Sequence, residues 1–487
     1  MTPQWRAICA AATALSCGAC AVGPTYHVPS TEIPAAFKES APASPAAANF
    51  LPAQPGDDTI RALWWEVFDD AQLNDLETRA TAANQNVAQA EAAFRAARAA
   101  VRGARAGLFP TLTGGATATR SRPSSNRVTG FAPGASNDYQ LTLDFSYEAD
   151  VWGRVRRNVE ANVATAQASA ADVQTALLIV TSELAVDYFQ LRGIDAQFDL
   201  LERTIASYER ALMLTTARFN QGVASGIDVA QAQTQLESAR VQATDLGTTR
   251  AQLEHAIATL TGAPPANVTI APAVIATNPP SIPAMVPSRL LERRPDVAAA
   301  ERRVASANAM IGVAKAAYFP SISLSGSGGV ESSVLGDLLT LPSRIWSIGP
   351  ALAATIFDGG LRHALTDQAV AGHDEAVATY RQNVLTALQD VEDNLAALRI
   401  LAQEAQQAED LVAAAQRSLV LANAQYTAGV ASYLQVISAQ TAALTAEATL
   451  VDIRARRMTA SVLLVKALGG GWSSADLPQP NDLRRSS

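Results

Sequence analysis

The chain has 487 residues and a formal net charge of −8 at pH 7. This length suits two or three ordinary domains. Its charges are spread along the chain without a basic patch, which argues against a nucleic acid partner. Frequent alanine, leucine, glutamine, glutamate and arginine favour helices.

All three cysteines lie in the first twenty residues, so disulfides, thiol catalysis and thiolate metal sites are excluded after Cys20. The chain opens with one basic residue, a short apolar run and small residues, the pattern of a secretory signal. Small residues followed by cysteine suggest lipoprotein processing. We predict a signal peptide over residues 1–19 and lipidation at Cys20, because Gly18 and Ala19 precede it. Cys17 competes with it, and ordinary cleavage beside an incidental cysteine is the alternative.

Residues 20–60 are rich in proline, alanine and serine and predict an extended arm. The stretch "LWWEVFDDAQLNDL" follows and begins the first helix. From there "LETRATAANQNVAQAEAAFRAARAAVRGAR" spaces small apolar residues three and four apart, which predicts one helix over about 76–105. Phe109 and Pro110 end it, because proline cannot continue the helical ladder.

Next, "DYQLTLDFSY" (138–147) alternates strictly between apolar and polar residues and predicts a strand with one apolar face. The predicted apolar face consists of Tyr139, Leu141, Leu143, Phe145 and Tyr147. Such a strand fits either the edge of a soluble sandwich or the wall of a transmembrane barrel. The preceding "TLTGGATAT" (111–119) is its predicted partner.

After "DVWGRVRR" a helix is predicted as far as about Asn220, on the order of 100 Å long at 1.5 Å per residue. The turn "GVASG" interrupts it, and another helix follows over about 228–260. No stretch after the signal has the 18 or more uncharged apolar residues typical of a membrane-spanning helix.

The same order of elements then returns after a proline-rich linker over residues 264–287. "FNQGVASGIDVAQAQ" and "YTAGVASYLQVISAQ" match in register about 207 residues apart. We therefore predict two structural repeats, residues 61–263 and 288–470, and a C-terminal tail over 471–487. Each repeat is helix, strand, strand, long helix, turn, helix.

The predicted strands have roughly the ten residues that cross a bilayer at a tilt. Four strands cannot close a barrel, and open edges are not tolerated in lipid. Two chains together would supply eight strands to a closed barrel, and three would supply twelve. A soluble coiled-coil protein with small β-caps is the alternative, but it leaves the secretion signal unexplained.

The segments "CAVGPTYHVP", "WWEVFDDAQLNDL", "LLERRPDVAAAERRVASANAMIGVAKAAYFP" and both "GVAS" turns cover most of the chain. In them the chain resembles the TolC-like outer membrane efflux proteins, specifically the lipoprotein (NodT-type) branch of resistance-nodulation-division pumps. The resemblance implies a mainly α fold with a small β part. Long antiparallel helical hairpins would form a periplasmic tunnel, and four strands per chain would join a twelve-stranded transmembrane barrel in a homotrimer.

The resemblance also implies a lipid-anchored protein of the outer membrane, docked by a periplasmic adaptor and served by an inner-membrane pump. Its expected function is the passive exit of small amphipathic compounds. Two alternatives remain: a protein-secretion duct of the same fold, and a structural periplasmic coiled-coil lipoprotein without a pore.

In the resembled family the repeated turn is the helix tip that the adaptor contacts. The resemblance thus assigns docking to Gly222, Val223, Gly429 and Val430. These glycines are also expected to end long helices in the left-handed conformation.

The family often closes its periplasmic end with aspartates just after this turn, which makes Asp228 a candidate gate residue. The favoured interpretation of Asp228, however, is an N-terminal helix cap. Its repeat mate is Gln435, and Ser438 stands where an aspartate often occurs, so the second repeat offers no acidic ring.

The sequence offers no catalytic constellation. The four histidines are isolated, without metal-ligand spacing or a serine or carboxylate arrangement beside them. We therefore predict no enzymatic activity, no cofactor and no metal.

Overall fold

The computed structural model describes residues 21–40, 63–124, 126, 134–274, 279–280, 282 and 293–484. Its first repeat contains η3 (Trp64–Phe68), α2 (Ala71–Ala83), α3 (Gln85–Ala106), β1 (Thr111–Ser121), β2 (Ser136–Glu148), α4 (Arg154–Asn220) and α5 (Gly226–Leu260). Its second contains α7 (Pro295–Ala316), β3 (Ser321–Ser332), β4 (Arg344–Ala353), α8 (Leu361–Thr427) and α9 (Tyr433–Ala467). The short elements are η1 (Lys38–Ser40), η4 (Pro265–Asn267), η5 (Leu335–Asp337), η6 (Leu341–Ser343), η7 (Ser474–Asp476) and α10 (Pro480–Arg484).

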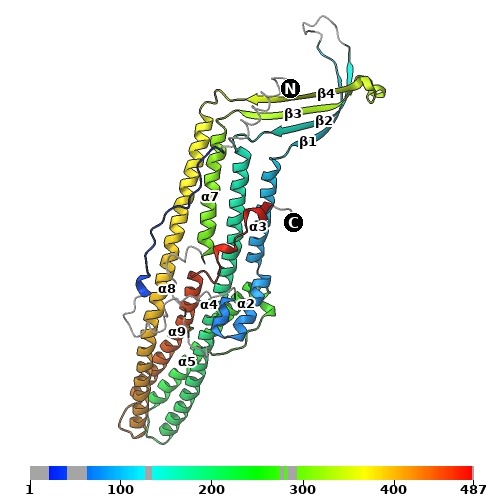
Figure 1. The fold of residues 1–487 in the computed structure, drawn as a ribbon. Coiled ribbons are helices and arrows are strands. Elements are labelled where there is room, and N and C mark those ends of the chain that lie inside the picture. Colours follow the sequence, from blue (N-terminus) through cyan, green and yellow to red (C-terminus); the bar gives the residue numbers. More distant parts are fainter. Residues whose placement is uncertain are drawn as a thin grey trace.

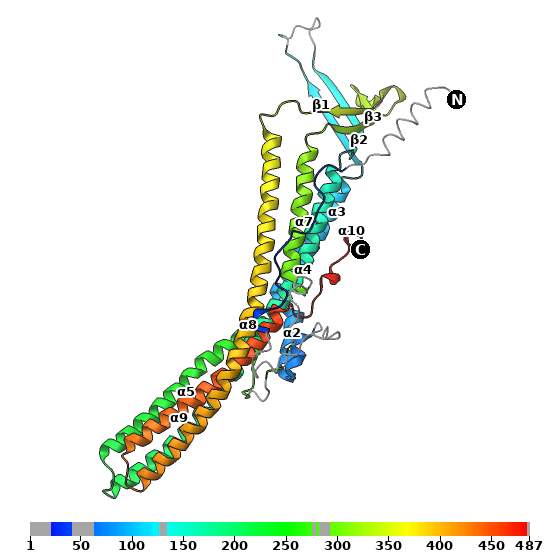
Figure 2. The same ribbon diagram turned by 60° about the vertical axis from the view of Figure 1, so that its left-hand side comes forward.

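The internal repeat is visible in the helix lengths. Helices α4 and α8 both have 67 residues, α5 and α9 both have 35, and α3 and α7 both have 22. Figure 1 shows α4 and α8 running from the sheet at one end of the molecule to the turns at the other. Helices α3 and α7 flank them near the sheet, and α5 and α9 flank them near the turns. In Figure 2, α5 and α9 lie at an angle to α3 and α7.

The four strands form one antiparallel sheet in the order β1-β2-β3-β4. The central pairing of β2 with β3, for example Leu141 opposite Val330, joins the two repeats. Among the described residues, β1 and β4 each have one edge that pairs with no other strand.

The strand register places apolar side chains of all four strands on one face. Leu112 lies opposite Phe145, and Leu143 lies opposite Gly328, which in turn lies opposite Trp346. Trp346, Ile348 and Leu352 are 79%, 69% and 70% exposed in the single chain. A wide exposed apolar face of this kind marks an interaction with lipid or another protein.

The helix predicted over about 76–105 is in fact two helices, α2 and α3, divided at Asn84. The Asn84 backbone is extended, with φ −67° and ψ 130°, and its side chain accepts hydrogen bonds from the N–H groups of Asn86 and Val87. Its amide also donates to the Leu260 carbonyl at 2.8 Å. The prediction of one helix was wrong because asparagine competes for backbone hydrogen bonds and caps a new helix.

One described helix, α4, contains an 18-residue window with a mean hydropathy of 1.3, enough by length and composition for a membrane span. No such window was expected after the signal, because polar residues interrupt the apolar runs of α4. The buried core helices of other proteins contain apolar windows of the same kind, and α4 packs against α3, α5, α7 and α9. We therefore interpret the apolar window as helix packing.

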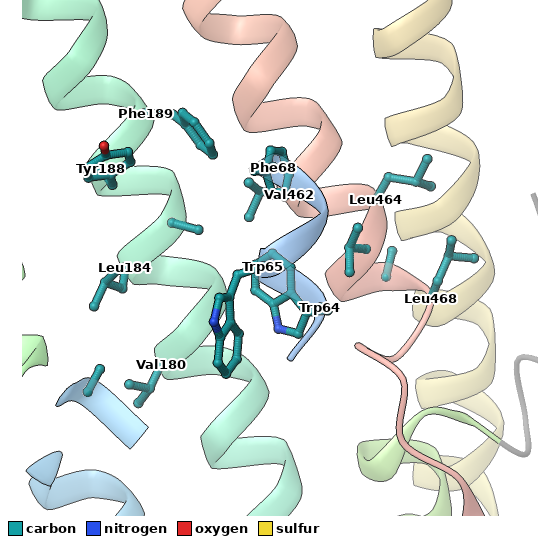
Figure 3. Packing of buried hydrophobic residues seen from close by; sticks show 14 of the residues in the cluster. Trp64, Trp65, Phe68, Val180, Leu184, Tyr188, Phe189, Val462, Leu464 and Leu468 are labelled. Atoms are coloured by element: carbon teal, nitrogen blue, oxygen red, sulfur yellow. The ribbon is translucent and has the colours of Figure 1, made fainter. Parts of the chain in front are cut away.

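A hydrophobic core lies midway along the molecule, where η3 packs between α4 and α9 (Figure 3). Trp64 and Trp65 are each 3% exposed, and the Phe68 ring lies 5.0 Å from the Phe189 ring. At this level a Cβ on Gly193 would lie 2.8 Å from the Ala455 side chain, so α4 and α9 approach closely.

The two chain ends cover different helices. The described part of the N-terminal arm is extended and follows α7 and α8, with Asn308 of α7 donating to the Pro24 carbonyl at 3.2 Å. In the C-terminal tail, the Pro478 carbonyl accepts from Gln167 of α4 at 3.1 Å. Leu483 is buried in a cluster with Val101 of α3.

Candidate functional site at the helix tips

The two repeated turns have the same backbone geometry. Gly222 and Gly429 are left-handed, with φ +72° and +73°. At the first turn the Val223 N–H donates to the Arg218 carbonyl at 2.9 Å, and Val430 makes the equivalent bond at 3.0 Å. This is the Schellman motif, whose left-handed position favours glycine. The prediction that both glycines end long helices is confirmed.

Exposed apolar side chains gather at both tips. Val223 is 64% and Val430 81% exposed. One turn further, Ile227 is 69% and Leu434 58% exposed, and these two residues occupy equivalent positions in the repeats. Sequence reasoning missed this second pair, although its constant distance from the "GVAS" turn could have revealed it. Each tip therefore presents two neighbouring apolar side chains.

Asp228 lies at the start of α5 and completes a capping box with Ser225. Its carboxylate accepts from the Ser225 N–H at 3.0 Å, and the Ser225 hydroxyl accepts from the Asp228 N–H at 3.3 Å. The helix-cap interpretation of Asp228 is thus confirmed. At the second tip Ser432 begins α9 without such a side-chain bond, and Gln435 stands at the Asp228 position.

A single arginine connects the end of α4 to the end of α8. The Arg218 guanidinium carbon lies 4.8 Å from the centre of the Tyr426 ring. One of its nitrogens donates to the Thr427 carbonyl at 3.2 Å, in the last turn of α8. This contact gave no sequence signal, because the repeat mate of Arg218 is Gln425.

Behind the two tips lies a small buried cluster shared by α5, α8 and α9. Its fully buried members are Ala232, Tyr426, Tyr433 and Val436. The two tyrosine rings lie 5.2 Å apart, and burial raises the pKa of Tyr433 to about 12. The tips of one chain therefore form one packed unit.

The predicted anchor, Cys20, and the signal peptide lie outside the described residues. Their nearest described neighbours lie where the sheet meets the long helices. The Val22 N–H donates to the Trp152 carbonyl at 3.1 Å, and a Cβ on Gly153 would lie 2.9 Å from the Ala21 side chain. Residue 21 thus lies at the sheet end of α4.

Among the described residues, no group of three or more histidine, cysteine, aspartate or glutamate side chains could hold a metal ion. The main features of the described chain are one sheet, the long helices α4, α5, α8 and α9, and two apolar tips.

Comparison with known proteins decides the family. The model of the outer membrane efflux protein family matches residues 76–263 and 286–470. The chain belongs to this family. It is 33% identical over 465 residues to the probable efflux pump outer membrane protein TtgC of Pseudomonas putida, covering 95% of each chain. It is 33% identical over 468 residues to OprJ of Pseudomonas aeruginosa, covering 94% of each.

Solved structures of outer-membrane channels have the same fold. The channel OprN superposes with a TM-score of 0.86 at 30% identity, over 93% of this chain and 100% of that one. Campylobacter jejuni CmeC superposes with a TM-score of 0.87 at 25% identity, over 94% and 96%. This outer membrane efflux protein therefore has the predicted TolC-like fold, location and role in efflux.

Proposed function

We propose that this efflux protein works as a homotrimeric exit duct, docked at its helix tips by a periplasmic adaptor and supplied by an inner-membrane resistance-nodulation-division pump. The observation that carries the proposal is the four-stranded sheet with an apolar face and two unpaired edges. Such a sheet cannot face lipid alone, because each unpaired backbone group in hydrocarbon costs several kcal/mol.

Three copies satisfy these edges by pairing β1 of one chain with β4 of the next. The resulting barrel would have twelve strands. The two repeats in each chain would then give six similar units around one axis. Each of these six units would end in a similar helix tip. A partner with six similar docking positions would therefore fit the ring of tips.

Adaptor docking is proposed for Gly222, Val223, Gly429 and Val430. The exposed apolar pair at each tip gives a small contact that is weak alone, and six such contacts engaged by one ring gain from multivalency. The glycines suit the left-handed backbone of the turns, and a Cβ added at either one would meet no described atom within 4 Å, so its cost would be backbone strain alone. Asp228 caps a helix beside the tip, and we propose it as a gate residue only in addition to that role.

The proposed cargo consists of small amphipathic compounds. Relatives are named a toluene efflux pump outer membrane protein and an antibiotic efflux pump outer membrane protein, both of Pseudomonas putida. These names favour a drug or solvent duct over a protein-secretion duct.

Lipidation of Cys20 is proposed as the anchor to the outer membrane. Ala21 rather than aspartate follows it, which in lipoprotein sorting implies transport to the outer membrane. Three acyl chains on one N-terminus exceed the single chain that binds membranes only marginally. The position of Ala21 at the sheet end of α4 supports this proposal.

The docking test uses Val223→Glu combined with Val430→Glu. Both side chains are exposed and neither backbone is strained, so the trimer and barrel should form normally while drug resistance and adaptor cross-linking are lost. Single replacements should be milder, because three tips remain intact. Val241→Glu is the matched control, since Val241 is 68% exposed on α5 away from the tips. Gly222→Glu with Gly429→Glu should abolish efflux as well.

The docking proposal fails if the double valine variant inserts, trimerises and still supports full resistance. In that case the tips are helix caps and nothing more.

A further inference from the structure

The charged side chains of the four-stranded sheet are divided by sign between its two faces. In β2 the odd-numbered residues from Tyr139 to Tyr147 form the apolar face, and the even-numbered residues form the polar face. Residues that lie directly opposite each other on neighbouring strands share a face. The register therefore assigns each charged residue of the other strands to one face.

The carboxylates of the strands all lie on the polar face. Asp138, Asp144 and Glu148 are even-numbered residues of β2. Glu331 of β3 lies opposite Gln140 and so shares their face. Ionised carboxylates belong in water, because their transfer to hydrocarbon is costly. In the proposed trimer this face lines the duct.

Both arginines of the strands lie on the apolar face instead. Arg120 of β1 lies opposite Asn137, an odd-numbered residue of β2. Arg344 of β4 lies opposite Val330, which itself lies opposite Leu141 of the apolar face. Both arginines are exposed, and among the described residues neither guanidinium has a hydrogen-bond or ion-pair partner. Two free cations thus stand on the face that would contact lipid.

The two arginines lie at the same end of the sheet. Strand β1 begins next to α3 and β4 ends next to α8, so the end of β1 and the start of β4 are both far from the helices. Arg120 is the last residue but one of β1, and Arg344 is the first residue of β4. Because the helices lie in the periplasm, this end of the sheet faces the cell exterior.

An aromatic side chain lies on the helix side of each arginine. Trp346 follows Arg344 by two residues on the same face and is 79% exposed. Tyr139 of β2 lies opposite Ala118, two residues before Arg120. Tryptophan and tyrosine of membrane barrels gather where the hydrocarbon meets the headgroups. The arginines therefore lie at the headgroup level, where an arginine on the lipid face costs little.

The proposed trimer brings the two arginines to one seam. Among the described residues, β1 and β4 are the outer strands of the sheet. When β1 of one chain pairs with β4 of the next, Arg120 of the first chain and Arg344 of its neighbour lie on the outer face of the same seam. The pair of arginines is therefore complete only in the trimer.

We propose that each seam binds a phosphorylated lipid of the outer leaflet, with Arg120 and Arg344 on its phosphate groups. A guanidinium is a planar fork of donors that fits a phosphate in bidentate geometry. The geometry favours a lipid over free phosphate, because Trp346, Ile348 and Leu352 continue the same face toward the helices and are between 69% and 79% exposed. They would contact the acyl chains. This inference rests on the proposed trimer.

The test is a cycle that removes the phosphates from the lipid and the arginines from the protein, separately and together. Native mass spectrometry of the detergent-solubilised trimer measures binding of diphosphorylated lipid A and of the same lipid freed of both phosphates. The wild type should bind the phosphorylated lipid at least about tenfold more tightly, since charge-assisted hydrogen bonds are made only to it. In Arg120→Gln with Arg344→Gln this preference should nearly disappear.

Arg203→Gln with Arg454→Gln is the matched control. It removes the same charge from exposed arginines of α4 and α9, outside the sheet, and should keep the wild-type preference. Arg120→Lys with Arg344→Lys keeps the charge but loses the planar fork, so its preference should be intermediate. Inorganic phosphate at the concentration of the lipid should displace none of it.

The outcomes separate the two proposals. If the purified protein forms no trimer, the proposed assembly fails, and the seam fails with it. If the trimer forms and the wild type binds both lipids equally, the inference alone is overturned, and this comparison needs no variant. An undiminished preference in the glutamine variant, or displacement of the lipid by inorganic phosphate, would overturn it as well.

Discussion

The guanidinium of Arg218 lies 4.8 Å from the ring centre of Tyr426, so the end of α4 is attached to the end of α8. The two residues are far apart in sequence and belong to different repeats. Because of this contact the two tips of one chain are a unit, and a partner that docks on one tip meets the other in a fixed position.

Arg218→Ala should loosen this unit. It removes the cation–π contact and the hydrogen bond to the Thr427 carbonyl, together worth about 1–2 kcal/mol. Amide hydrogen exchange over residues 426–433 should become faster, while exchange in the sheet stays unchanged. Arg218→Lys should lie in between, since it keeps the charge and loses the planar stack. Unchanged exchange in Arg218→Ala would show that the cluster around Tyr433 holds the tips by itself.

Glu77 makes stability depend on pH. Its side chain is fully buried in α2, and neither carboxyl oxygen has a hydrogen-bond partner among the described residues. Burial raises its pKa from 4.5 to about 9. Between these values the folded carboxyl keeps its proton while the unfolded one loses it, so the free energy of unfolding falls as the pH rises.

Glu77→Gln should remove this dependence. The variant should unfold at nearly the same temperature as the wild type at pH 5 and be more stable by about 1–3 kcal/mol at pH 8. Asp75→Asn is the control, because Asp75 lies on the exposed face of the same helix. Thermal unfolding of the detergent-solubilised protein at both pH values measures the difference. A constant gap between wild type and Glu77→Gln at all pH values would contradict the buried-acid account.

Cys20→Ala should impair maturation and assembly more than final membrane affinity, because the sheet itself enters the membrane. Metabolic labelling with a radioactive fatty acid measures lipidation directly. Labelling should be lost in Cys20→Ala and kept in Cys17→Ala. The reverse pattern would assign the anchor to Cys17.

The sequence predicted much of this fold because the strongest signals are local and occur twice. Long helices without proline, the two "GVAS" turns and the alternation over 138–147 each indicate their structure directly. Strand β1 is rich in threonine, glycine and alanine, so its apolar face emerges only from the register with β2.

At the tips, too, features set by neighbouring residues could be predicted, whereas contacts between distant segments could not. Gly222 and Gly429 could be predicted from the turn itself, and so could the cap at Asp228. The partner of Arg218 could not, because it joins elements of different repeats. The division at Asn84 was also missed, since one asparagine interrupts a stretch that otherwise favours helix.

This outer membrane efflux protein works as a passive duct. Single-channel recording of the purified protein in planar bilayers tests it most directly, with insertion checked by flotation of the same protein in vesicles. We expect discrete conductance steps that need no nucleotide or cofactor. Protein that floats with the vesicles as a folded trimer yet never conducts would contradict it.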